Sequence, residues 1–213
     1  MDFLPSLPVL LAFSAAGLLL ALTPGPDMTL FLGRTLSQGR QAGLAVLLGT
    51  SLGCLVHTIA AAIGLSVLIA ASPAGFWALK IVGALYLLWL AIQAIRSGST
   101  FRLDRKTAAS VSFWRNVMVG LGVNLLNPKV VIFFITFFPQ FVSATDPDAW
   151  KKMLFLGVYF VALTVPMLVV MILMADRLAH VLTRNPMVAR SIDWLFATVF
   201  ATFAIKILLT EGR

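Results

Sequence analysis

The chain has 213 residues, of which 60% are hydrophobic and only 11% are charged. Soluble domains carry about 25% charged residues, so this composition excludes an ordinary soluble protein and predicts an integral membrane protein. The formal net charge of +8 does not indicate nucleic-acid binding, because no soluble stretch interleaves lysine or arginine with stacking aromatic residues. Cys54 is the only cysteine, which excludes an intrachain disulfide and dithiol redox chemistry. No cleaved signal peptide is expected, because the N-terminus carries Asp2 and no cation.

The apolar residues fall into six runs long enough to cross a bilayer, which takes about 20 residues per helix. No connection between them is long enough to fold alone, so we expect one transmembrane domain over 1–213 with an all-α fold. The predicted spans are 4–36, 42–70, 75–96, 113–142, 151–175 and 191–210.

Arginine and lysine gather at every second connection. Residues 37–41, 97–110 and 176–190 carry or border most of the cations. Loops rich in these residues face the cytoplasm. These three connections are therefore predicted to be cytoplasmic, and an even number of spans places both termini on the periplasmic side.

The first and fourth spans are too long for straight helices, and both contain helix breakers. The first is interrupted by TPGPD (23–27), with Pro24 and Pro26, and the fourth by NLLNPK (124–129), with Pro128. Proline is favoured at the first position of a helix. Each motif is therefore interpreted as the end of one helix and the start of another.

The matched breaks divide the chain into two three-span repeats, about 1–98 and 108–213. Because three is odd, the second repeat enters the membrane from the opposite side. Inverted repeats with broken helices in matching positions are typical of secondary transporters, which bind substrate near the breaks. The alternative is a pair of proline kinks in a structural bundle, which explains neither the matched positions nor the charges beside them.

One ionisable residue follows the proline of each break: Asp27 in the first and Lys129 in the second. Asp27 has a structural explanation, because a carboxylate stabilises a helix N-terminus. Lys129 lies at the wrong end of its half-helix for that effect, and a buried cation is costly in the membrane. We therefore expect Lys129 to be compensated by Asp27 or by an anionic group of the substrate.

Opposite charges at the two breaks suit a zwitterion. The ammonium group of an amino acid would bind Asp27, and its carboxylate would bind Lys129 and free backbone N–H groups. Asp27 also offers a proton-coupling site. No second acid lies deep within a predicted span to bind a lysine side chain, which favours small neutral substrates. The other residues of the predicted substrate site are Thr23, Gly25, Asn124 and Asn127.

A stripe of small residues leads to a histidine in the second span. Ala45, Gly49, Gly53 and His57 recur every four residues, and small residues let membrane helices approach closely. His57 either hydrogen-bonds a neighbouring helix or serves as a proton relay or part of the substrate path. The only other histidine is His180, so no metal site is expected.

Further motifs accompany the two breaks: GRTLSQGRQAGL (33–44), KIVGALYLLWLAIQAIRSG (80–98) and NPKVVIFFITFFPQFV (127–142). Together with TPGPD and NLLNPK they resemble the LysE/RhtB family of bacterial amino-acid exporters. The resemblance implies a six-helix homodimer in the inner membrane that exports amino acids or close analogues, driven by the proton motive force. Family substrates range from lysine to threonine, homoserine and leucine. The family motif maps onto Pro24, Gly25, Pro26, Asp27, Asn127, Pro128 and Lys129.

An intramembrane enzyme is a rival interpretation. The chain has no HExxH motif, no plausible serine–histidine–aspartate set and no paired carboxylates within the spans. A membrane subunit or scaffold of a larger transport complex is the alternative function. We expect a proton-linked exporter that works by alternating access, without a cofactor, with an amino acid, protons and the lipid bilayer as its partners.

Overall fold

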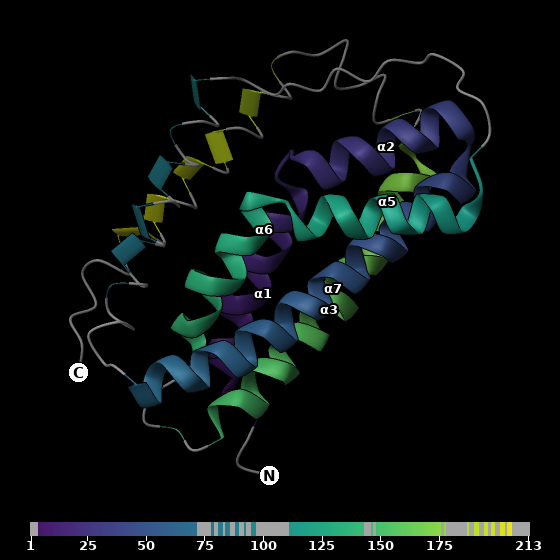
Figure 1. Cartoon of the computed structure of the whole chain (residues 1–213). Coiled ribbons are helices and arrows are strands. Elements are labelled where there is room, and N and C mark those ends of the chain that lie inside the picture. The colour runs from purple at the N-terminus through teal and green to yellow at the C-terminus, as the bar shows by residue number, and fades with distance from the viewer. Residues whose placement is uncertain are drawn as a thin grey trace.

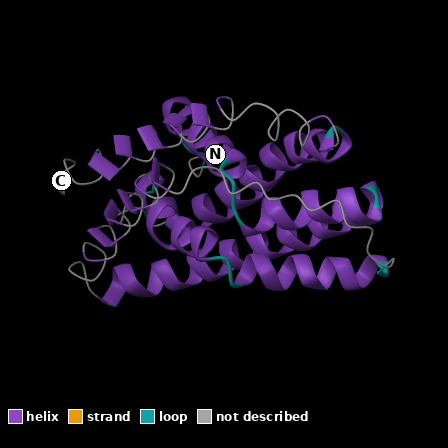
Figure 2. Cartoon of the chain, turned by 90° about the horizontal axis from the view of Figure 1, so that it is seen from above, coloured by secondary structure: helices purple, strands orange, loops and turns teal. Residues whose placement is uncertain are grey.

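The computed structural model describes residues 4–71, 111–142 and 148–175 without interruption, together with Asp146 and isolated positions at 78–96, 177 and 187–205. The regular elements among these residues are all helices, and no strand occurs among them (Figure 2). The predicted spans 75–96 and 191–210 are described only at isolated positions, all of them helical, and the connections 97–110 and 176–190 lie almost entirely outside the described residues.

The first bent pair of helices consists of α1 (Leu7–Leu22) and α2 (Pro26–Gln38), with 54° between them. The helix α1 ends where the backbone N–H of Thr23 bonds back to the carbonyl of Leu19 (2.9 Å). Pro24 and Pro26 have no N–H with which to continue it. Gly25 is the N-cap of α2 and Pro26 its first residue, so local chemistry accounts for the bend.

The second bent pair consists of α5 (Phe113–Leu125) and α6 (Pro128–Ile132), with 55° between α5 and the segment from Pro128 to Phe141. The side-chain oxygen of Asn127 caps α6 by accepting from the backbone N–H of Lys129 (3.1 Å). Beyond α6 the chain continues as a π-turn, Phe133–Phe137, and a 3₁₀ turn, Phe138–Phe141. Pro139 cannot donate the hydrogen bond of a continuing α-helix, so this segment is not a regular α-helix throughout.

Two long continuous helices complete the described bundle, α3 (Arg40–Ala71) and α7 (Ala149–Leu173). The stretches Arg40–Gly64 and Ala149–Leu173 are long and apolar enough to cross a membrane, and each bent pair would add one span in the described part of the chain. Gly39 joins α2 to α3 with a φ of 92°, a conformation that glycine adopts at little cost.

The helix α3 packs against α2, α5 and α7 (Figure 1). At its crossing with α5 there is no room for side chains. A Cβ on Gly49 would collide with the backbone of Val117, and one on Gly120 with that of Val46. The close helix approach predicted from the small-residue stripe is therefore confirmed for α3 and α5.

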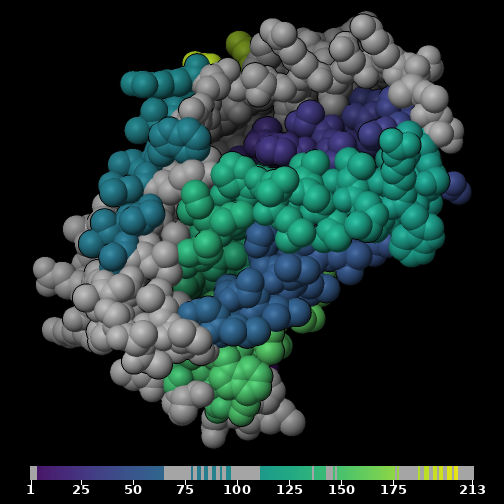
Figure 3. Space-filling view, viewed as in Figure 1, coloured from purple at the N-terminus to yellow at the C-terminus, as the bar shows by residue number. Residues whose placement is uncertain are grey.

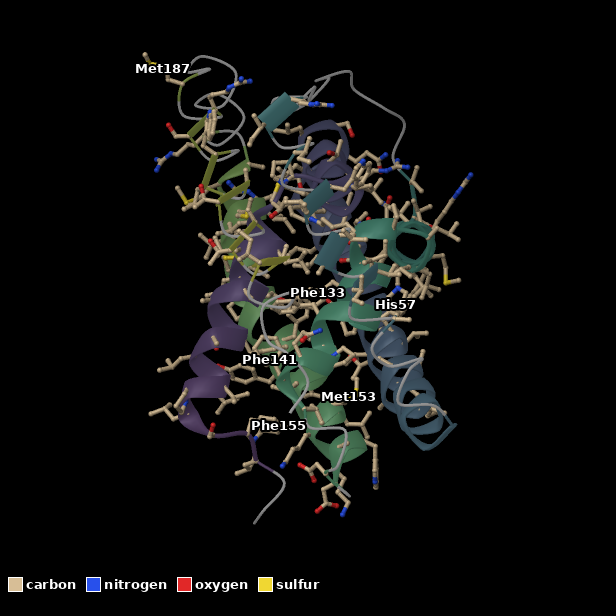
Figure 4. All side chains as sticks on the ribbon, turned by 90° about the vertical axis from the view of Figure 1, so that its left-hand side faces the viewer. His57, Phe133, Phe141, Met153, Phe155 and Met187 are labelled. Carbon is tan, nitrogen blue, oxygen red and sulfur yellow. The ribbon has the colours of Figure 1, made fainter. Side chains whose placement is uncertain are left out.

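An aromatic cluster holds the segment after α6 in place. Phe133, Phe134 and Phe138 are buried against Phe13 of α1 and Phe160 of α7. The rings of Phe13 and Phe138 meet edge to face at 5.3 Å between centroids. Figure 4 labels Phe133 and Phe141, two members of this aromatic packing. The cluster ties the second bent pair to α1 and α7, and so positions Lys129 at the start of α6.

Two ion pairs close the turn before α7. Lys152 binds Asp146, and the Nζ of Lys151 lies 2.6 Å from Asp148. The hydrogen bond from the Lys152 side chain, followed by one from the backbone N–H of Asp148, lowers the pKa of Asp146. The carboxylate form of Asp146 therefore stabilises this turn.

Replacing Asp146 should make a pH-dependent difference to stability. A carboxylate with a depressed pKa adds stability above its unfolded pKa, about 3.9 for aspartate, and this stability is lost as the pH falls through the folded pKa. Asp146→Asn is expected to lower the melting temperature of the purified protein slightly at neutral pH, with the two proteins converging in acid. Thermal unfolding at a series of pH values checks this. A difference that is the same at every pH would contradict an origin in the ion pair.

Candidate functional site

The two breaks lie against each other, and the ammonium group of Lys129 bridges them. Its Nζ donates to the carbonyl of Thr23 (2.8 Å) and to the carbonyl of Leu20 (3.2 Å). These carbonyls belong to the C-terminal end of α1, where unpaired acceptors and the helix dipole favour a cation. The second break therefore supplies the cap for the helix that ends at the first.

Asp27 makes the reciprocal contact. The Nδ2 of Asn124, near the C-terminal end of α5, donates to the Oδ2 of Asp27 (2.7 Å). Asp27 lies in the first turn of α2, where a carboxylate also complements the helix dipole. Each break thus sends its ionisable side chain to the helix that ends at the other break.

This geometry corrects the expectation about the partner of Lys129. Among the ion pairs of the described residues, none joins Lys129 to Asp27. The backbone carbonyls of Leu20 and Thr23 stabilise the ammonium instead. The burial of Lys129 therefore does not itself require a substrate carboxylate.

A cavity of about 60 Å³ lies between the two breaks. Asp27 and Lys129 are the only charged residues among the described residues that line it. Apolar side chains from several helices, including Leu20, Phe134 and Phe160, form much of the remaining wall. Cavities that bind small molecules span about 300–1,000 Å³, so the cavity in this conformation is too small for an amino acid.

Two residues that line this cavity carry a buried oxygen that accepts no hydrogen bond. The Oδ1 of Asp27 and the Oδ1 of Asn124 are both buried and have no hydrogen-bond partner. An ammonium group has three N–H donors, and Lys129 uses two of them on the α1 carbonyls. Asp27, Asn124 and Lys129 all line the same small cavity, so two residues with a free buried acceptor and one with a free cationic donor meet there, a set that an amino acid's ammonium and carboxylate groups would complete.

Several residues that line the cavity were not predicted from the sequence to belong to the site. Thr50, Ser51 and Cys54 of α3 and Thr164 of α7 all line the cavity. The spacing of Thr50, Ser51 and Cys54 places them on one helical face, and this polar face within an apolar span was the available signal. Thr164 gave no such signal, because it is isolated in α7 and bonds back to the carbonyl of Phe160 (2.8 Å).

Three predicted site residues lie beside the cavity rather than among its described lining. The hydroxyl of Thr23 donates to the carbonyl of Leu19 (2.7 Å), while its own carbonyl accepts from Lys129. Asn127 is buried and uses its side-chain oxygen as the α6 cap, which leaves its Nδ2 without a partner. Gly25 lies against Lys129, because a Cβ built there would be 3.1 Å from the Nζ.

His57 lies next to the site and contacts it through Asn124. Its Nε2 is 3.4 Å from the backbone carbonyl of Asn124, and its ring stacks on Phe134 with 5.6 Å between centroids. Figure 4 labels His57 on α3. These contacts fit the interpretation of His57 as a bridge to a neighbouring helix, and the proton-relay interpretation is a separate proposal.

Comparison with known families decides the class of the protein. Residues 18–211 match the sequence profile of the family described as LysE type translocator, and this range is most of the chain. The chain belongs to the LysE-type translocator family.

Named relatives of this LysE-type translocator align along nearly its whole length. The homoserine/homoserine lactone efflux protein of Salmonella typhimurium is 28% identical over 202 residues, which cover 95% of this chain and 96% of the relative. The leucine efflux protein of Salmonella choleraesuis is 24% identical over 200 residues, 94% of each chain. An uncharacterized membrane protein of Vibrio cholerae is 29% identical over 192 residues, 90% of this chain and 92% of the relative. No solved structure matches this LysE-type translocator.

Within the part of the chain that the structure describes, no three histidine, cysteine, aspartate or glutamate side chains are grouped to hold a metal ion. The site offers charge and hydrogen bonds, which are the means to bind and release a polar solute.

Proposed function

We propose that the chain is a secondary active exporter of amino acids. The single observation that carries the proposal is a set of free polar atoms on residues that line the small cavity between the breaks, called the inner cavity below: the Oδ1 of Asp27, the Oδ1 of Asn124 and the third N–H of Lys129. Membership of a translocator family and the names of the efflux relatives support it. They also favour a transporter over an enzyme.

The substrate would bind as a zwitterion across the two breaks. Its ammonium group would donate to the free oxygens of Asp27 and Asn124, and its carboxylate would accept from Lys129. Hydrogen bonds to charged groups contribute about 1.5–3 kcal/mol each, enough to select an α-amino acid over a neutral solute. Thr23, Gly25 and Asn127 would shape the site by holding Lys129 and the ends of α1 and α6.

The substrate side chain would be small and neutral. The cavity lining combines apolar residues with the hydroxyl-bearing residues Thr50, Ser51 and Thr164, and its described part contains no acid besides Asp27. A lysine side chain would therefore find no counter-ion. Homoserine and leucine, which appear in the names of two relatives, fit this class of substrate.

Transport would proceed by alternating access between two inverted three-helix repeats, with α1–α2 and α5–α6 as the broken first helix of each. The reciprocal contacts of Lys129 and Asp27 support such a pseudo-two-fold relation. The cavity is too small for an amino acid, so the two halves would have to separate to admit it. Asp27, with His57 as a second candidate, would carry the proton that couples transport to the proton motive force.

The protein would lie in the bacterial inner membrane as a homodimer, with both termini in the periplasm and the connection at Gly39 in the cytoplasm. The positions of the cations support this orientation. A cysteine-accessibility map that places residues 37–41 outside the cell would overturn it.

The proposal is tested by transport of labelled amino acids into inside-out vesicles from expressing bacteria. A panel of homoserine, leucine, threonine and lysine is expected to show uptake of the small neutral members, abolished by an uncoupler of the proton gradient. Vesicles without the protein provide the baseline. Uptake of no amino acid above this baseline would refute the proposed function.

Asp27→Asn is expected to weaken substrate binding strongly. The asparagine can still accept from Asn124 but has lost the charge that would hold the substrate ammonium. The loss of a charge-assisted bond, about 1.5–3 kcal/mol, corresponds to a KM raised about 10- to 100-fold. Asp148→Asn, in the turn before α7, is the matched control and should leave KM unchanged. An unaltered KM in Asp27→Asn protein that reaches the membrane would exclude Asp27 from the site.

A further inference from the structure

A second, larger cavity lies on the other side of the first break. It has a volume of about 740 Å³ and runs along one face of α2 from Gly25 to Ser37, with Val123 of α5 opposite. Figure 3 shows α2 and α5 side by side on one face of the molecule. Cavities that bind small molecules span about 300–1,000 Å³, so this outer cavity is large enough for an amino acid.

Arg34 is the only charged residue among the described residues that line the outer cavity. No hydrogen bond or ion pair joins its guanidinium to another described residue. The neighbouring Gly33 leaves open space, because a Cβ there would meet nothing within 4 Å. Side chains on a helix lean toward its N-terminus, which for Arg34 is the direction of the break. The cation therefore has room to bind an anion inside this cavity.

Gly25 lies next to both this cavity and the ammonium group of Lys129. Gly25 lines the outer cavity and Lys129 lines the inner one. A Cβ at Gly25 would be 3.1 Å from the Nζ and 3.4 Å from the Cε of Lys129. The backbone of Gly25 is extended, with a φ of −174°, so the close approach and not the dihedral angle requires glycine. Arg34 and Lys129 thus line two cavities that both reach the first break, where Gly25 contributes no side chain.

We propose that the outer cavity is the cytoplasmic vestibule through which substrate reaches the site, and that Arg34 binds the α-carboxylate of the amino acid before Lys129 does. This inference rests on the proposed function and its orientation. The planar guanidinium matches a carboxylate with two parallel hydrogen bonds. The carboxylate would then move from Arg34 past Gly25 to Lys129. It would keep a cationic partner at both ends of this step within the membrane.

The vestibule is tested first without any substrate, by chemical labelling. Thr29 is exposed and lines the outer cavity, so Thr29→Cys in a Cys54→Ser background places one thiol there. Anionic and cationic thiosulfonate reagents are applied to inside-out and right-side-out vesicles. Labelling is expected from the cytoplasmic side, and the ratio of anionic to cationic rates should fall about fivefold or more when Arg34→Gln is added. Labelling only from the periplasmic side, or an unchanged ratio, would overturn the inference.

Carboxylate recognition is tested with homoserine and homoserine lactone, in which the carboxylate and hydroxyl of homoserine are joined as a ring ester and no anionic group remains. In inside-out vesicles Arg34→Gln is expected to raise the KM for homoserine about tenfold while Vmax stays within about twofold. The KM for the lactone should not change. Arg34→Lys keeps the positive charge but not the fork geometry, and should lie between wild type and Arg34→Gln.

Arg40→Gln is the matched control, because Arg40 is exposed at the start of α3 and is not among the described lining of the cavity. An equal effect of Arg34→Gln and Arg40→Gln, or an equal effect on both probes, would show general surface attraction and refute the role of Arg34. Wild-type vesicles that take up neither probe nor any amino acid of the panel would refute the proposed function instead. The labelling ratio then still decides whether the vestibule attracts anions.

Discussion

Lys129→Met is expected to lower amino-acid export at least about 100-fold, because the ammonium group serves both the fold and the proposed substrate. Its bonds to the carbonyls of Leu20 and Thr23 close the end of α1. Its remaining N–H is the only cationic donor among the described residues of the inner cavity. A charge-assisted bond contributes about 1.5–3 kcal/mol. Because the variant loses this bond and also the alignment of the break, the export rate should fall by about 100-fold or more. Initial rates of uptake into inside-out vesicles measure the effect.

The methionine variant also leaves the carbonyl of Thr23 without its donor, while that of Leu20 keeps the backbone N–H of Thr23. An unpaired buried carbonyl costs about 1–3 kcal/mol, so the variant can fail to fold. Lys129→Gln separates the two roles. Its amide can still donate to the α1 carbonyls but carries no charge. We expect this variant to melt near the wild-type temperature and to transport with a KM raised about 10-fold or more.

Lys151→Gln is the matched control for the loss of a lysine. Lys151 pairs with Asp148 at the surface, with a side chain that is 47% exposed, and exposed pairs contribute about 0–1 kcal/mol. Its removal should change neither uptake nor melting temperature appreciably. Folded Lys129→Gln protein with wild-type KM would show that Lys129 is only a helix cap.

Gly49→Ala is expected to destabilise the protein by about 2 kcal/mol or more, an effect typical of overpacking. The new Cβ would meet the backbone of α5 at Val117 and Leu121. Backbone atoms cannot rotate away as the end of a side chain can, so α3 and α5 would have to separate. Reversible unfolding in mixed micelles, or the yield of monodisperse protein after heating, measures the loss.

Gly64→Ala is the control on the same helix, because a Cβ at Gly64 would meet nothing within 4 Å. Alanine is favoured over glycine in a helix by about 1 kcal/mol, so this variant should be as stable as wild type or more so. Equal stability of the Gly49 and Gly64 variants would mean that α3 and α5 do not cross as closely as described.

The helix ends at the two breaks could be predicted because their causes are local. Pro26 and Pro128 each remove an N–H and fix φ at the start of a helix, whatever packs around them. The contact stripe of Gly49 on α3 was also predictable, since its spacing is a property of the helix itself. By contrast, the sequence of Phe133–Phe141 indicated only one apolar segment. Its π-helical and 3₁₀ geometry depends on packing against α1 and α7 as well as on Pro139.

The partner of Lys129 was beyond a sequence argument for a physical reason. The groups that bind it are backbone carbonyls at the end of α1. Every residue carries a backbone carbonyl, so the residue types of the sequence do not indicate which carbonyls bind Lys129. The sequence therefore offered Asp27 or an anionic group of the substrate as the partner, whereas Asp27 accepts from Asn124 in the structure. Only the packing of one break against the other decides which carbonyls an ammonium can reach.

The sequence by itself determined that this is a helical membrane protein, where α1 and α5 end, and which two charges stand at the breaks. Those properties follow from composition, from proline and glycine stereochemistry and from residue spacing, all of which act within a few residues. The tertiary structure decided that Lys129 caps α1, that Asp27 and Asn124 keep free buried oxygens beside a small cavity, and that Arg34 lines a second cavity that also reaches Gly25. These depend on contacts between helices about 100 residues apart in the chain, which local stereochemistry does not specify.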